Sequence, residues 1–181
     1  HEPFLKAYND ANGTDFVMVE PKTAAPLFAM YSEKIKSVDE LKDGDTIALC
    51  SDASNKARGL HLLESQGLIT LDDSVETPTQ YDIKENKLNL KFIEADIQSL
   101  PDVAAILCAA AHMVNAGLDG TDYVCASDDA ETYAVGFVVR KEDKDAEWAT
   151  GLAKAVQCDA LADYYKTEKK GTMVPMWELN K

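Results

Sequence analysis

The segment Ser51–Arg58 carries the residue types in this sequence that are best suited to binding chemistry. It follows a short apolar run, 46–50, and its small polar residues come just before a helical pattern. The N-terminus of a helix favours an anion, so Arg58 in the first turn would oppose the helix dipole unless a negative group lies beside it. A bound carboxylate would satisfy both, held by the guanidinium fork. The alternative, a surface arginine paired with one of the many acidic residues, stays open at this point.

Residues that could carry catalysis lack the arrangement that catalysis needs. There is no G-x-S-x-G nucleophile elbow, and Ser51 is followed by Asp52 rather than by a turn glycine. His1, His61 and His112 have no neighbour that would orient a base, and the helical pattern places His61 on an exposed face. The glycine-rich nucleotide motif and the Walker A lysine loop are also missing. We therefore expect a protein that is not an enzyme and that uses no cofactor.

The four cysteines, Cys50, Cys108, Cys125 and Cys158, have no tight spacing of the metal-binding kind, so we expect no metal site. The first three lie among apolar residues, which is typical of buried thiols. An even number permits disulfides, although the spacing cannot assign them. Between the two states we favour free thiols, because 181 residues can build a core without cross-links.

The charge balance excludes several classes of partner. Lys and Arg total 18 against 32 Asp and Glu, a formal net charge of −14. Such a surface repels nucleic acids and gives no basic face for an anionic membrane. No apolar run approaches the roughly 18 residues of a membrane-spanning helix. The chain opens at His1 without an initiator methionine or a leader pattern, so we expect its start to be processed, engineered or incomplete.

Strand-like and helix-like patterns alternate along the chain, which predicts an α/β protein with mostly parallel sheet. The expected strands are 15–19, 46–50, 87–94, 102–111 and 133–140. The expected helical segments are a turn at 37–41 capped by Ser37, a helix capped by Ser54 or Asn55 and stopped by Gly67, a continuation over 112–116, and a helix over 146–165. A loop is expected from 68 to 78. In such sheets ligands bind beyond the carboxyl ends of strands, where Ser51–Arg58 lies.

Five segments together resemble motifs of the methionine-binding lipoproteins of the NlpA/MetQ type, which are solute-binding proteins of ABC importers. HEPFL at 1–5 resembles the family's FQHxPYL, and YSEKIKSVDEL at 31–41 resembles YSKKIKSLDEL. The other three segments are 46–71, 82–86 and 133–146. In the first of these, Asn55 and Arg58 are in register with the family's asparagine and arginine. The similarity covers nearly the whole chain.

The resemblance implies a two-lobed periplasmic-binding-protein fold of type II, in which lobes close around a ligand by hinge motion. Lobe 1 would be 1–44 and 121–181, and lobe 2 would be 45–120. The family also implies a permease and an ATPase as partners and an extracytoplasmic, lipid-anchored location in the cell envelope. The signal peptide and the lipidated cysteine would precede His1, so contact with the membrane would depend on an anchor that is absent from this chain.

Carried over one residue at a time, the resemblance assigns Arg58 to the ligand carboxylate and Asn55 to a position beside it. His1 and Phe4 fall on positions that line the pocket for the ligand side chain.

Ala109 and Val135 are departures, because they stand where the family has asparagines that hold the polar end of the ligand. Each lost hydrogen bond to a charged group is worth roughly 1.5–3 kcal/mol. Two such losses would weaken methionine binding by on the order of 10²–10⁴.

Two functions follow from these residues. The favoured one is the solute-binding component of an ABC importer for methionine or a related small carboxylate, which works by cleft closure without bond chemistry. The alternative is a divergent surface lipoprotein on the same scaffold, with a degenerate pocket, that acts through protein contacts. The substitutions Ala109 and Val135 favour this alternative.

Overall fold

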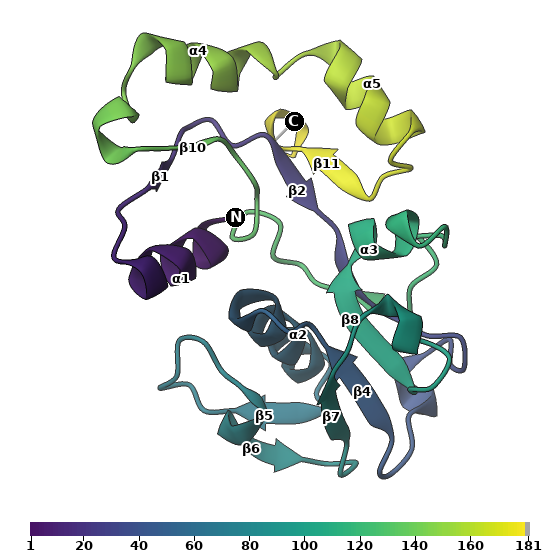
Figure 1. Cartoon of the computed structure of the whole chain (residues 1–181). Helices are drawn as coiled ribbons and strands as arrows, with labels where there is room; N and C mark the ends of the chain where they lie inside the picture. Colours follow the sequence, from purple (N-terminus) through teal and green to yellow (C-terminus); the bar gives the residue numbers. More distant parts are fainter. Residues whose placement is uncertain (180–181) are drawn as a thin grey trace. The chain divides into compact units, whose positions relative to one another are not determined.

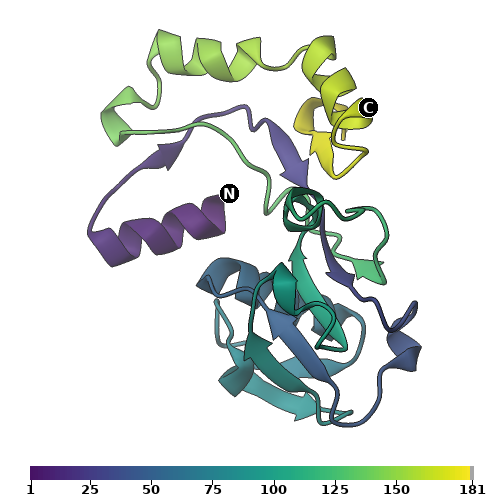
Figure 2. The same ribbon diagram turned by 45° about the vertical axis from the view of Figure 1, so that its right-hand side comes forward.

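The structure is a computed structural model that describes residues 1–179 and divides the chain into two compact units. The central unit is Phe28–Ser127, and the outer unit combines His1–Leu27 with the chain from Asp128 onward. Each unit has its own hydrogen-bonded strands (Figure 1, Figure 2).

The borders of the units differ from the expected borders of the lobes, 44/45 and 120/121. The central unit takes in the chain from Phe28 because the strand that starts there pairs within the central sheet.

The central unit is built on a five-stranded mixed sheet with the strand order β7-β4-β8-β3-β9. Its strands are β3 (Phe28–Tyr31), β4 (Thr46–Leu49), β7 (Lys91–Glu94), β8 (Ala105–Ala109) and β9 (Cys125–Ala126). A separate antiparallel pair is formed by β5 (Ile69–Leu71) and β6 (Ile83–Asn86). The helices of this unit are α2 (Ala53–Ser65) and α3 (Ala110–Asn115).

The prediction of an α/β protein is confirmed, but the prediction of mostly parallel sheet is wrong for the described residues. Strand β4 runs parallel to β7 and β8, whereas β3 runs antiparallel to β8 and β9. The three two-stranded sheets are antiparallel. The reason is that β3 enters the sheet at the edge where β4 and β8 leave it. This edge therefore collects the ends of β4 and β8 and the start of β3.

The core of the central unit lies between α2 and the sheet. Leu60 and Leu63 share one helical face, as expected, and both are fully buried. They pack with apolar side chains of β3, β4, β5 and β8, including Phe28, Leu49 and Leu107. The burial of these apolar side chains fixes α2 against the strands and holds its N-terminal turns at the edge of the sheet.

The outer unit contains shorter elements and a small core. Its helices are α1 (Glu2–Asn12), α4 (Glu147–Ala155) and α5 (Asp159–Thr167). Its strands pair antiparallel as β1 (Val17–Met18) with β10 (Val138–Val139), and as β2 (Ala24–Pro26) with β11 (Met173–Pro175). A core of Val19, Ala149 and Ala153 joins the chain after β1 to α4.

Several expected elements have other bounds. The 146–165 helix breaks at Cys158, which has extended backbone angles, so that α5 can pack against β11. The 133–140 strand is reduced to β10 and an isolated bridge at Val135. The 68–78 loop contains β5, and the 87–94 strand begins only at Lys91 because Asn89 turns with a φ of 48°. The spacing of apolar residues along the sequence does not show where these helices and strands begin and end.

Candidate functional site

The segment singled out by the sequence is a strand–turn–helix. Strand β4 is buried, and the chain leaves the sheet at Cys50 and begins α2 at Ala53. The cap of α2 is Asp52, whose Oδ1 accepts a hydrogen bond from the Asn55 backbone N at 2.9 Å. The prediction of Ser54 or Asn55 as the cap is therefore wrong. Asp52 takes the role because it is the last residue with extended backbone and lies three residues before the amide that it caps.

The Asp52 carboxylate also holds two side chains. Its Oδ1 accepts from Ser54 Oγ at 2.9 Å, and the Asn55 Nδ2 donates to both carboxylate oxygens at 3.2 and 3.1 Å. Burial by itself raises the pKa of Asp52, but the hydrogen bonds from Asn55 and Ser54 together hold that pKa below its ordinary value. Asn55 is thus oriented with its nitrogen on Asp52, which turns its amide oxygen away from that carboxylate.

Arg58 is buried, and its guanidinium contacts two residues from outside α2. Its side chain is 2% exposed, and its Cζ lies 4.7 Å from the centroid of the Phe28 ring. Its Nη2 donates to Ser127 Oγ at 3.4 Å, and that hydroxyl donates to the Phe28 carbonyl at 3.2 Å. The interpretation of Arg58 as a surface residue is therefore wrong. Arg58 lies in the second turn of α2 rather than the first, so the helix dipole opposes it less than expected.

Ala109 lies at the same edge of the central sheet. It is the last residue of β8 and stands opposite Phe28 in the β3–β8 register. The edge therefore combines a buried guanidinium, an aromatic face, a hydroxyl and the amide of Asn55. Sequence reasoning missed Phe28 and Ser127. The apolar run Phe28–Tyr31 is a strand signal that could have indicated Phe28, whereas nothing local marks Ser127, 69 residues away from Arg58.

In the outer unit the structure brings His1 and Phe4 together. His1 caps α1, and its Nδ1 accepts from the Phe4 backbone N at 3.2 Å. The His1 ring meets the Phe4 ring edge-on at 6.1 Å and the Tyr133 ring at 5.0 Å between centroids. Phe4 is 49% exposed, whereas Tyr133, which the sequence reasoning did not single out, is buried.

Val135 is held through its backbone. Its carbonyl accepts from the Thr23 N at 2.8 Å and from Thr23 Oγ1 at 3.0 Å, and its own N donates to the Ala24 carbonyl at 2.7 Å. The six residues expected at the site thus fall three in each unit: Asn55, Arg58 and Ala109 in the central unit, and His1, Phe4 and Val135 in the outer unit. In the central unit, Phe28 contacts Arg58 and stands opposite Ala109 in the sheet register. In the outer unit, the His1 ring contacts the Phe4 ring.

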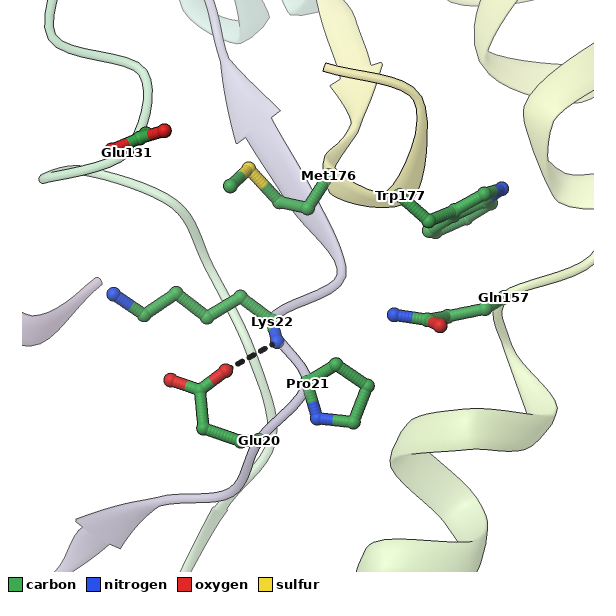
Figure 3. A pocket seen from close by; sticks show the side chains of 7 residues that line it. All are labelled: Glu20, Pro21, Lys22, Glu131, Gln157, Met176 and Trp177. Carbon is green, nitrogen blue, oxygen red and sulfur yellow. Dashed lines mark hydrogen bonds between the residues drawn. The ribbon is translucent and has the colours of Figure 1, made fainter. Parts of the chain in front are cut away.

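A hollow of about 350 Å³ lies elsewhere in the outer unit (Figure 3). It is lined by Glu20, Pro21, Lys22, Glu131, Gln157, Met176 and Trp177. Lys22 is the cationic residue of this hollow, and its Nζ lies 2.8 Å from Glu2 Oε2. The backbone N of Lys22 donates to Glu20 Oε2 at 3.1 Å. None of the six expected residues lines this hollow, so we do not place the site there.

Other classes of site are not found in the described part of the chain. Residues 1–179 contain no group of three or more His, Cys, Asp or Glu side chains that could hold a metal ion. No helix among these residues is long and apolar enough to cross a membrane. All four cysteines are free thiols in the structure. His61 is exposed, as expected, with its Nδ1 3.5 Å from Glu64.

Comparisons with family models, curated proteins and solved structures point to the same family. The model of the NlpA lipoprotein family matches residues 1–177. The D-methionine-binding lipoprotein MetQ of Salmonella typhi is 36% identical over 185 residues, which covers 98% of this chain and 68% of that protein.

Two solved structures have the same fold. One is an ABC transporter periplasmic substrate-binding protein from Coxiella burnetii, with a TM-score of 0.88 and 32% identity. The other is a nutrient-binding protein from Burkholderia cenocepacia bound to methionine, with a TM-score of 0.88 and 31% identity. Each match covers 97% of this chain and 76% of the solved chain. The expected periplasmic-binding-protein fold is thereby confirmed.

Proposed function

Because this chain belongs to the NlpA lipoprotein family, we propose that it is the solute-binding component of an ABC importer and binds methionine or a related small carboxylate. Relatives described as D-methionine-binding and as an ABC transporter substrate-binding protein support this role. The alternative of a degenerate pocket that acts only through protein contacts is not favoured, since one structural neighbour is bound to methionine.

The observation that carries the proposal is the buried Arg58 at the edge where β4 and β8 end. A guanidinium offers two parallel N–H groups to a carboxylate, and such charge-assisted hydrogen bonds are stronger where water is excluded. The Phe28 ring and the Ser127 hydroxyl hold the guanidinium in one orientation, so little conformational entropy is lost when a ligand binds. We assign the ligand carboxylate to this group.

The remaining contacts of the site are proposed on the resemblance together with local geometry. The Asn55 amide oxygen, turned away from Asp52, is an acceptor for a ligand ammonium. Ala109 and Val135 offer no side-chain hydrogen bonds, so the polar end of the ligand depends on Arg58 and Asn55 within this set. His1 and Phe4 are proposed to contact the apolar part of the ligand.

The partners and the location are also proposals. In an importer, the binding protein delivers its ligand to a permease that is driven by an ATPase, and we propose such a pair as partners. We propose an extracytoplasmic location and a lipid anchor in the cell envelope, in keeping with the lipoprotein names of the relatives. The two compact units are proposed to be the two lobes of the binding protein. These assignments involve binding and release, with no chemical step.

Isothermal titration calorimetry with L-methionine, D-methionine and apolar carboxylates tests the proposal. Replacing Arg58 with alanine removes two charge-assisted hydrogen bonds of roughly 1.5–3 kcal/mol each, so we expect the affinity to fall by on the order of 10²-fold or more. Arg58→Lys keeps the charge but loses the fork, and its affinity should lie between those of the two proteins.

The chain contains one other arginine, Arg140, which is exposed and provides the matched control. Arg140→Ala makes the same change of charge and should leave the affinity unchanged. If Arg58→Ala binds as tightly as the parent protein while its circular dichroism spectrum is native, the carboxylate assignment is wrong.

A further inference from the structure

Two cysteines lie on neighbouring strands at the edge of the central sheet. Cys50 directly follows β4, and Cys108 is the next-to-last residue of β8. The two strands are parallel, with Ala48 opposite Ile106 in their register. Cys50 and Cys108 each lie two residues beyond this pair, which places them on adjacent segments at the same edge of the sheet.

The spacing of the two strands suits a disulfide. Neighbouring strands lie about 4.8 Å apart, and the Cα atoms of a disulfide are usually about 4.4–6.8 Å apart. A hydrogen bond supports the placement independently, because the Cys50 Sγ donates to the Leu107 carbonyl at 3.4 Å. The thiol of Cys50 therefore already lies against β8, one residue from Cys108.

The other two cysteines are placed differently. Cys125 is on β9, and β3 lies between β9 and β8 in the sheet. Two strand spacings amount to about 9–10 Å, beyond the roughly 7 Å at which a disulfide can still form without movement of the backbone. Cys158 belongs to the outer unit, where it precedes α5. Among the four cysteines, Cys50 and Cys108 are thus the pair that the central sheet brings together.

We propose that Cys50 and Cys108 form an intrachain disulfide when the protein meets a low-molecular-weight disulfide, and that this bond ties β4 to β8 beside the Ser51–Arg58 segment. Cys50, half-buried, is the thiol that the reagent reaches first, because Cys108 is 3% exposed. The Cys50 thiolate attacks the reagent and forms a mixed disulfide, and one small thiol leaves. The Cys108 thiolate then attacks the Cys50 sulfur and displaces the second small thiol. The two cysteines lose two protons and two electrons, which the reagent carries away as two thiols.

The environment of the two thiols sets the speed of this exchange. Burial raises the pKa of Cys50 to about 11 and that of Cys108 to about 12. The nearby Asp52 also raises the pKa of Cys50, and Arg58 lowers it by a smaller amount. Since the thiolate is the reacting form, we expect the cross-link to form about tenfold faster for each unit of pH below these values.

Incubation of the purified chain with oxidised glutathione at pH 8.5, followed by alkylation in denaturant, tests the proposal by mass spectrometry. We expect two of the four thiols to resist alkylation, and the linked peptides to contain Cys50 and Cys108. Trypsin leaves Cys108 and Cys125 on one peptide, because no Lys or Arg lies between them. A second protease that cleaves at Asp119 or Asp122 separates these two cysteines. A stable glutathione adduct on Cys50, a bond to Cys125 or Cys158, or four alkylated thiols would overturn the proposal.

Matched variants identify the pair. Cys50→Ser and Cys108→Ala should each abolish the cross-link, whereas Cys125→Ser, which changes another half-buried thiol, should retain it. Cys50→Ser alters a half-buried position and so provides the decisive variant even if Cys108→Ala, at a buried position, folds poorly. Persistence of the cross-link in Cys50→Ser refutes the assignment.

Discussion

Replacing Asp52 tests whether the turn before α2 is held by its carboxylate. In the parent protein, Asp52 accepts from the Asn55 backbone N, the Asn55 Nδ2 and the Ser54 hydroxyl. Loss of the helix cap costs about 1 kcal/mol. The Ser54 hydroxyl is buried, and leaving it without its acceptor adds about 1–2 kcal/mol. We therefore expect Asp52→Ala to lower the free energy of unfolding of the central unit by about 2–3 kcal/mol.

The matched variant Asp52→Asn keeps an oxygen acceptor for the cap and removes only the charge. Asparagine caps helices about as well as aspartate, and the lost attraction to the helix dipole is worth about 0.3–1 kcal/mol. Asp52→Asn should therefore lose less than about 1 kcal/mol. Equal losses in the alanine and asparagine variants would show that charge rather than the hydrogen bonds holds the turn.

The pH dependence of these variants gives a second readout. The pKa of Asp52 is lowered in the folded protein, so its stabilising contribution is present above the ordinary aspartate pKa of about 4. The contribution is lost as the pH falls through the lowered value. The difference between the parent protein and Asp52→Asn should thus be constant near pH 7 and shrink as the pH falls below about 4.

The assay must report on the central unit. Both tryptophans, Trp148 and Trp177, belong to the outer unit, so their fluorescence follows that unit only. Hydrogen exchange of the α2 amides, combined with urea unfolding followed by circular dichroism, reports on the Asp52 variants. Native exchange of α2 in Asp52→Ala would refute the reasoning.

Three further substitutions test packing and hydrogen bonding, at Gly59 and Tyr31 in the central unit and at Gly151 in the outer unit. A Cβ at Gly59 would lie 3.2 Å from the Cβ of Leu107, which is fixed by the strand, so Gly59→Ala should lose about 1 kcal/mol in urea unfolding, because overpacking outweighs the gain in helix propensity. A stabilising Gly59→Ala would contradict the packing argument. At Gly151 in α4 a Cβ meets open space, so Gly151→Ala should raise the free energy of unfolding of the outer unit by about 0.5–1 kcal/mol, measured by tryptophan fluorescence. The buried Tyr31 hydroxyl donates to the Gly120 carbonyl at 2.8 Å, so Tyr31→Phe should cost about 1–2 kcal/mol by circular dichroism, and an unchanged midpoint would contradict this.

The class of fold and the segment proposed to bind the ligand could both be predicted from local patterns of residues. The buried run of β4, the polar turn and the apolar face of α2 are local patterns, and each is formed by residues within a few positions of one another. The cap at Ser37 was predictable for the same reason, because the hydroxyl and the amide of Asp39 that it caps are two residues apart. The resemblance that indicated the family likewise depends on short strings.

The environment of Arg58 could not be predicted in this way, because it depends on segments that are distant in the sequence. Its guanidinium contacts the Phe28 ring and the Ser127 hydroxyl, which lie 30 residues before it and 69 residues after it in the sequence. No local pattern links such positions. The antiparallel entry of β3 had the same cause, since strand direction follows from the path of the whole chain. The break between α4 and α5 keeps a helical spacing of apolar residues across it, so periodicity could not reveal it. Local rules fix what each segment can form, whereas burial against distant segments selects which of those forms the protein adopts.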